Sequence, residues 1–133
     1  MTIAIDNLPL NVFYKRILEL INFTKTSMDK RMTEAEIDLL TLFLSLPDKF
    51  SYQRFSTLAK TKVMNMAEER GWKLSRVNIN NKIYALIDKG FLRRDEDGVV
   101  YLTKSLQQAI DLATTAYNKK SNFNIDFVFK WME

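Results

Sequence analysis

The 133-residue sequence has no cysteine and no histidine. It therefore lacks disulfides, thiolate or histidine metal ligands, and the Ser-His and Cys-His pairs of nucleophilic catalysis. Its only glycines are Gly71, Gly90 and Gly98, so no glycine-rich phosphate loop is present. We therefore expect no catalytic residues, no metal site and no cofactor, and we interpret the protein as not being an enzyme.

Long apolar runs are also missing. No segment approaches the ~18 consecutive apolar residues of a membrane helix, and the N-terminus lacks the basic region and apolar block of a secretion signal. We expect no membrane partner and a cytoplasmic protein, located in the host cytoplasm or the virion if it is of phage origin.

Few glycines and prolines, together with 47% hydrophobic residues, favour long helices around a real core. We predict a mostly α (α+β) fold that forms one globular domain overall. Its parts are an N-terminal arm and helix (1–32), a core (33–103), and a C-terminal helix with a terminal strand (104–133). Apolar residues at helical spacing predict helices over 10–23, 34–46, 55–70, 75–89 and 104–117.

Local signals fix several helix ends. Thr33 and Glu36 form a capping-box pattern, Ser75 and Thr103 are N-cap candidates, and Gly71 and Gly90 follow two of the helices. The apolar stripe of the helix over 75–89 consists of Ile79, Ile83, Leu86 and Ile87.

Short strands are expected at three places. The runs 91–94 and 99–102 predict a β-hairpin around the turn Asp95-Glu96-Asp97-Gly98. Residues 2–6 and 122–131 alternate like strands, and an apolar strand face must pair with the other terminal strand, the domain body or another chain. We therefore interpret the apolar face of the second terminal strand as a candidate oligomerisation surface, made of Phe123, Ile125, Phe127, Phe129 and Trp131.

Charge is unevenly distributed along the chain. The net charge is +4, but residues 49–94 contain eleven Lys/Arg against three Asp/Glu, a net +8, which leaves −4 for the remainder. A basic block of this kind fits a surface for a negatively charged partner, and an ordinary solvated face is the alternative.

The segment 74–94, Leu-Ser-Arg-Val-Asn-Ile-Asn-Asn-Lys-Ile-Tyr-Ala-Leu-Ile-Asp-Lys-Gly-Phe-Leu-Arg-Arg, resembles the recognition helix and first wing strand of winged helix-turn-helix proteins. The continuation 95–103 resembles the wing and Leu-Thr exit of regulators similar to the multiple-antibiotic-resistance repressor group. The resemblance covers 33–117. Two departures are a longer helix over 55–70 and a short wing with an acidic tip.

The resemblance implies a winged-helix core with a β-hairpin wing, base contacts within 75–84, and dimerisation through the flanking helices 10–23 and 104–117. Asparagine can pair bidentately with adenine, Val77 and Ala85 can touch thymine methyl groups, and Arg or Lys can bind guanine or phosphate. The candidate residues for binding double-stranded DNA are Lys60, Lys62, Arg70, Lys73, Ser75, Arg76, Val77, Asn78, Asn81, Lys82, Tyr84, Arg93 and Arg94.

Some acidic residues oppose this interpretation. Asp88 projects from the same helix face, and the acidic hairpin tip would repel the phosphates that line a minor groove. The alternative is a structural or assembly subunit, for example of a phage particle or a packaging complex, whose winged-helix core packs against other subunits. A transcriptional or replication regulator is the function we expect first.

Overall fold

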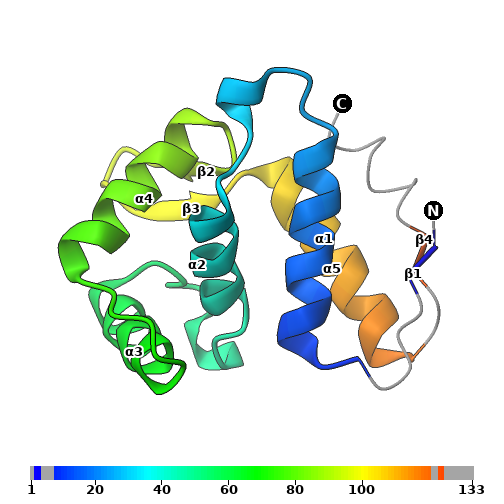
Figure 1. Cartoon of the computed structure of the whole chain (residues 1–133), viewed down its shortest axis with the longest axis horizontal. Coiled ribbons are helices and arrows are strands. Elements are labelled where there is room, and N and C mark those ends of the chain that lie inside the picture. Colours follow the sequence, from blue (N-terminus) through cyan, green and yellow to red (C-terminus); the bar gives the residue numbers. More distant parts are fainter. Residues whose placement is uncertain (1, 4–7, 121–122, 125–133) are drawn as a thin grey trace.

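The computed structural model describes residues 2–3, 8–120 and 123–124, which form five α-helices, two short 3-10 helices and two small antiparallel sheets (Figure 1). This confirms the expected mostly helical α+β fold. The elements are β1 (Thr2–Ile3), α1 (Leu10–Phe23), η1 (Met28–Lys30), α2 (Glu34–Leu44), η2 (Asp48–Phe50), α3 (Thr57–Glu69), α4 (Arg76–Asp88), β2 (Leu92–Arg94), β3 (Val100–Leu102), α5 (Lys104–Asn118) and β4 (Phe123–Asn124).

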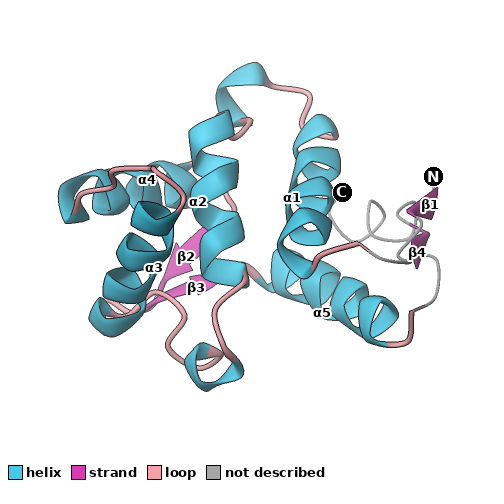
Figure 2. Ribbon diagram, turned by 60° about the horizontal axis from the view of Figure 1, so that its bottom comes forward, coloured by secondary structure: helices cyan, strands magenta, loops and turns pink. Residues whose placement is uncertain are grey.

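Helix α2 lies at the centre of the fold. It runs between α1 on one side and α3 and α4 on the other, with the β2–β3 hairpin beside it (Figures 1 and 2). The stretch from Leu39 to Leu44 is buried throughout, so α2 contacts protein on nearly every side. The predicted capping box starts it: the Thr33 hydroxyl accepts from the Glu36 amide at 3.2 Å, and the Glu36 carboxylate accepts from the Thr33 amide at 2.8 Å.

Helices α1 and α5 pack together on the side of α2 that faces away from α3 and α4 (Figure 2). The rings of Phe13 and Tyr117 lie 5.1 Å apart, and the Tyr14 hydroxyl lies 3.1 Å from that of Thr114. A single cluster of buried side chains extends from α1 through α2, α3 and α4 to α5. The flanking helices are therefore joined to the central ones by a shared hydrophobic core.

Helices α3 and α4 follow each other through a short turn. α3 begins at Thr57, after the Ser56 hydroxyl caps the Ala59 amide, so the predicted start at residue 55 was two residues early. At its end Gly71 has φ +76°, and the amide of the following Trp72 donates to the Ala67 carbonyl. A left-handed residue of this kind reverses the chain within one residue, which is why glycine occupies the position.

The β2–β3 hairpin follows α4 directly. Its register pairs Leu92 with Leu102. The Asp95 carboxylate closes the turn because it accepts from the amides of Asp97 and Val99, both at 2.9 Å. Thr103 precedes α5 as predicted, but its side chain makes no capping hydrogen bond: its amide donates to the Phe91 carbonyl at 3.1 Å, and its hydroxyl does so at 3.4 Å.

The two ends of the chain meet in the second sheet. β1 pairs antiparallel with β4, with Thr2 opposite Asn124. Of the alternatives open from the sequence, the described part of the terminal strands pairs within the chain. The predicted oligomerisation residues Ile125, Phe127, Phe129 and Trp131 lie outside the described residues, as does the side chain of Phe123. None of the described helices has the length and apolar character that crossing a bilayer requires.

Candidate nucleic-acid interface

Helix α4 presents a polar face to solvent. Ile79, Ile83 and Leu86 are buried, as the predicted stripe requires, and Ile87 is half-buried. The outer face carries four of the predicted DNA contacts: Val77, Asn78, Asn81 and Tyr84 are all exposed, Val77 and Tyr84 at 67% and 55%. The major groove of DNA admits an α-helix, so the side chains on this exposed face could reach the edges of bases.

One flank of α4 contacts α3 and the hairpin through side chains four residues apart. The Arg76 guanidinium donates to the Thr61 hydroxyl at 2.7 Å. The Asn80 side-chain oxygen accepts from the Lys60 ammonium at 2.8 Å. The Arg94 guanidinium lies 5.0 Å from the centre of the Tyr84 ring. Residues at i and i+4 share one helix face, so these contacts form a continuous row.

Lys60, Arg76 and Arg94, called the cation cluster below, contact only neutral groups in this row. Within the described residues no ion pair joins any of the three to a carboxylate. Burial lowers the pKa of Lys60, and the positive charges of Arg76 and Arg94 lower it further. The three cations therefore repel one another, and a bound anion would relieve that repulsion.

A hollow of about 620 Å³ opens beside this row, between the start of α3, the middle of α4 and the hairpin. Lys60 and Arg94 line it, together with the hydroxyl-bearing Ser56 and Thr57 at the start of α3. The positive end of a helix dipole lies at such a start. Basic side chains, hydroxyl groups and the helix start together favour a negatively charged ligand.

The other predicted residues of the α4 region have varied positions. Ser75 serves as N-cap, and its hydroxyl accepts from the Asn78 amide at 3.1 Å. Asn78 and Lys73 line a separate hollow at the α3–α4 turn. Lys82 is half-buried on α4. Ser75 therefore caps the helix, Asn78 and Lys82 lie on α4, and Lys73 lies in the turn before it.

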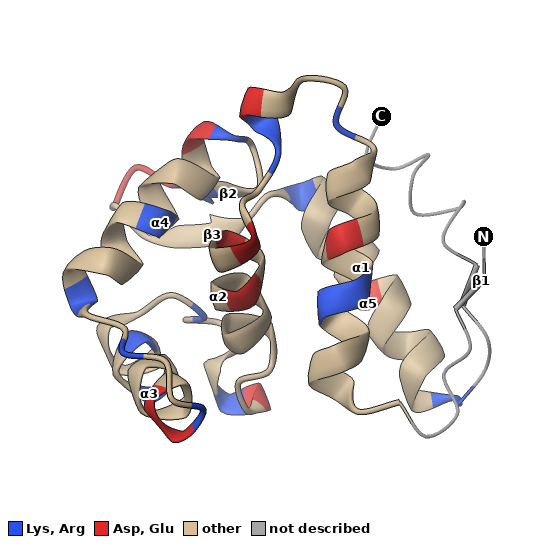
Figure 3. Ribbon diagram, in the orientation of Figure 1, with Lys and Arg blue, Asp and Glu red and all other residues tan. Residues whose placement is uncertain are grey.

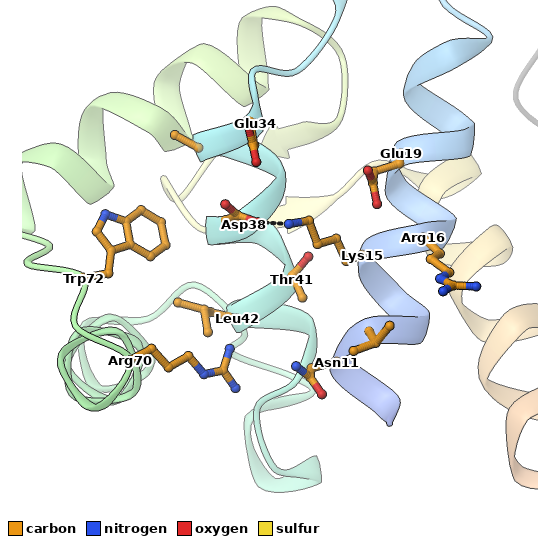
Figure 4. Close-up of a pocket in the computed structure, with 12 residues that line it drawn as sticks. Asn11, Lys15, Arg16, Glu19, Glu34, Asp38, Thr41, Leu42, Arg70 and Trp72 are labelled. Carbon is orange, nitrogen blue, oxygen red and sulfur yellow. Dashed lines mark ion pairs between the residues drawn. The ribbon is translucent and has the colours of Figure 1, made fainter. Parts of the chain in front are cut away.

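Besides Lys73 and Lys82, three predicted cations lie outside the cation cluster. Lys62 is exposed on α3 two residues from Lys60, which places it about 200° around the helix axis. Arg93 lies 4.7 Å from the Tyr101 ring, on the opposite side of its strand from Arg94. Arg70 lines the groove between α1 and α2 (Figure 4). The structure thus divides the basic residues among several faces.

Sequence reasoning missed Asn80, Thr57 and Thr61, which position the cluster. The Thr57 carbonyl accepts from Arg76 at 3.4 Å. The spacing of residues 76, 80 and 84 was a signal for Asn80, because positions four apart share a helix face. Nothing in the local sequence indicated the two threonines, which belong to a different helix.

Three of the four acidic residues expected to oppose DNA are exposed. Asp88 is exposed at the end of α4, and so are Glu96 and Asp97 at the hairpin tip. Asp95 is half-buried and holds the turn through its two amide contacts. The tip therefore carries two solvent-facing carboxylates, whereas the base of the hairpin carries arginines.

The region around α1 and α2 has a different charge pattern, with acidic residues on both helices (Figure 3). A groove of about 760 Å³ separates α1 from α2, and the ion pair between Lys15 and Asp38, at 2.9 Å, crosses it (Figure 4). Nearby, the Lys89 ammonium lies 2.5 Å from the Glu36 carboxylate and joins the end of α4 to the start of α2. Lys15 and Lys89 therefore each have an acidic partner, whereas no ion pair within the described residues involves Arg16 or Arg70, which also line the groove.

Comparisons with protein-family models, curated proteins and solved structures found no match to this chain.

Proposed function

We propose that residues 33–117 form a winged-helix unit that binds double-stranded DNA, with α4 as the helix that enters the major groove and the β2–β3 hairpin as the wing. The observation that supports this most is the row along α4, where an exposed polar helix face adjoins three cations that have no acidic partner among the described residues. Such a face offers base contacts and phosphate contacts side by side.

Two exposed side chains of α4 suit particular base contacts. Asn81 can donate to and accept from the edge of an adenine, and Val77 can lie against a thymine methyl group. The cation cluster lies on the flank of the helix, where the sugar-phosphate backbone would run. Base reading is thus assigned to the outer face, and affinity is assigned mainly to the cluster.

The wing takes part through its base. Arg94 belongs to the cation cluster, whereas Glu96 and Asp97 at the tip face solvent. A minor groove concentrates negative potential, so two carboxylates at the tip disfavour insertion there. The wing therefore contacts the backbone from its first strand, and its tip stays outside the groove.

The proposed role is a transcriptional or replication regulator rather than an enzyme. Proteins that read DNA with one helix usually dimerise so that two such helices reach successive major grooves. We propose that the terminal segments provide the contacts between copies. The assembly-subunit alternative becomes the favoured function if the basic face binds no DNA.

The test is binding to mixed-sequence duplex DNA, followed by fluorescence anisotropy at about 50 and 200 mM salt. If about six basic residues meet phosphates, log K falls with log[salt] with a slope of roughly −5. The variant Arg76→Ala/Lys82→Ala is expected to bind more weakly and with a shallower slope. The charge-matched control Lys49→Ala/Lys119→Ala removes two exposed lysines outside the proposed interface and is expected to keep a slope close to that of the wild type. Absence of binding at the lower salt concentration would overturn the proposal.

A further inference from the structure

We propose that the hollow between α3, α4 and the hairpin is a binding site for a single phosphate group, held by Lys60 and Arg94 with Arg76 at its edge. The inference rests on the proposed function in that the expected phosphate belongs to the DNA backbone. The same chemistry would hold the phosphate of a small free ligand, and the experiment below separates these two sources.

The charge of the hollow supports an anion. No aspartate or glutamate lines it, whereas Lys60 and Arg94 do. Arg76 reaches its rim through the carbonyl of Thr57, which is also a lining residue. Placing like charges together in a partly buried site carries a cost in free energy, and the lowered pKa of Lys60 reflects that cost.

The donors at the site are already positioned. The Lys60 ammonium has three N–H groups and shares one contact with Asn80, which holds it in place and leaves donors for a ligand. Arg94 stacks over the Tyr84 ring, which restricts its planar guanidinium. Preorganised donors lose less conformational entropy when a phosphate binds.

The start of α3 adds a third kind of donor. This helix has thirteen residues, and the Ser56 hydroxyl caps the Ala59 amide, while Ser56 and Thr57 both line the hollow. Backbone amides in the first turn of a helix point along its axis toward such a position and favour negative charge. This feature strengthens a site that the basic side chains already define.

The shape of the hollow suits a phosphate that is part of a chain. It is open to solvent on the side of Tyr84 and Val99, both of which are exposed. These side chains offer apolar surface to the sugars on either side of a backbone phosphate. One duplex could therefore place its bases against the outer face of α4 and one of its phosphates in this hollow.

The first arm of the experiment uses inorganic phosphate and no DNA. Amide ¹H–¹⁵N spectra are recorded as phosphate replaces chloride at constant ionic strength. We expect saturable shifts at residues 56–60 and around Tyr84, which Lys60→Met abolishes and Lys62→Met retains. Lys62→Met is a matched control because it removes the same charge from the same helix on a different side. Shifts scattered over surface lysines, or equal shifts with chloride alone, would overturn the proposal.

The second arm measures duplex DNA by anisotropy. Lys60→Met is expected to weaken binding about tenfold at ~0.1 M salt, to a similar extent for every duplex sequence, and to reduce the salt slope by about one. Arg94→Met serves as a second variant should Lys60→Met give the spectrum of an unfolded chain. A loss at both positions no larger than for Lys62→Met would contradict the phosphate site while the DNA-binding function stands.

The two arms separate failure of the inference from failure of the proposed function. If phosphate binds in the hollow but the wild-type protein binds no duplex, the DNA-binding proposal fails and the free-ligand source is supported. If DNA binds and inorganic phosphate competes more strongly than sulfate at equal ionic strength, the backbone phosphate occupies the same site.

Discussion

The cations on the two sides of this molecule have different partners. Around α2, Lys15 contacts the carboxylate of Asp38, and Lys89 contacts that of Glu36. In the cation cluster, the contacts go to an amide, a hydroxyl, a carbonyl and an aromatic ring. A charge with an acidic partner is already used in folding, whereas a charge held by neutral groups is still available to an external anion.

This difference separates stability from binding. Removing a paired cation or its partner leaves an uncompensated charge, so the cost appears in the free energy of unfolding. Removing a cation whose only charged neighbours are also positive relieves repulsion, which offsets the loss of its neutral contacts, so the main cost appears in the affinity for an anion. Four predictions test the comparison.

The largest effect is expected from removing the whole cation cluster. The triple variant Lys60→Met/Arg76→Met/Arg94→Met is expected to lose on the order of a hundredfold or more in DNA affinity at ~0.1 M salt, because three phosphate contacts disappear. Its free energy of unfolding, measured by urea denaturation, is expected to equal or exceed that of the wild type. A large loss of stability would show that the cluster is structural and would remove the contrast between the two sides.

The second effect concerns the ion pair between α2 and α4. Glu36→Gln keeps an oxygen for the Thr33 amide but removes the charge that faces Lys89. We expect a loss of ~2 kcal/mol in the free energy of unfolding, since the largely buried Lys89 ammonium loses its charged partner. Urea denaturation measures the loss.

The control for this pair is Glu34→Gln, which neutralises an exposed carboxylate in the same first turn and is expected to cost about 0.5 kcal/mol through the helix dipole. The salt slope for DNA is expected to stay unchanged in both variants. Equal losses for the two would mean that the contact with Lys89 contributes nothing beyond the charge of the first turn.

Much of the fold follows from local signals in the sequence. The capping box of Thr33 and Glu36, the Ser75 cap and the glycine after α3 all depend on residues within a few positions of one another, and the structure confirms them. The hairpin around Asp95 is of the same kind. Interactions of short range can be predicted because the helix or turn itself brings the partners together.

The candidate site was less predictable because it depends on packing between elements. Nothing in the local sequence distinguishes Lys60 from Lys62 as a ligand-binding residue. Only the packing of α3 against α4 brings the Lys60 ammonium within hydrogen-bond distance of the Asn80 side-chain oxygen. The net +8 of residues 49–94 also includes Arg54, whose pKa burial lowers, and Lys89, which is paired with a carboxylate outside the segment. A count of charges therefore overstates the charge that the surface offers.

A smaller effect is expected at the hairpin tip. Neutralising both exposed carboxylates with Glu96→Gln/Asp97→Asn is expected to strengthen DNA binding about threefold, because repulsion of nearby phosphates decreases and is screened over roughly 10 Å at 0.1 M salt. Anisotropy at two salt concentrations measures the gain. Asp95 is left intact because its carboxylate accepts two amide hydrogen bonds that hold the turn. No gain, or a loss, would place the tip away from DNA or against a basic partner.

The smallest effect is expected from the ion pair that crosses the groove between α1 and α2. The Lys15 and Asp38 side chains are each 38% exposed, so Lys15→Met is expected to cost only about 0.5 kcal/mol of unfolding free energy at neutral pH. The hydrogen bond to Asp38 is the main cause that raises the pKa of Lys15 above its ordinary value.

A raised pKa in the folded state fixes the direction of the pH dependence. The contribution of Lys15 is complete below the ordinary pKa of 10.5 and is lost as pH rises through the higher folded value. Urea denaturation at pH 7 and in the alkaline range should therefore show the difference between wild type and Lys15→Met shrinking as pH rises. A difference that stays constant across that range would mean that the charge of Lys15 does not contribute to stability.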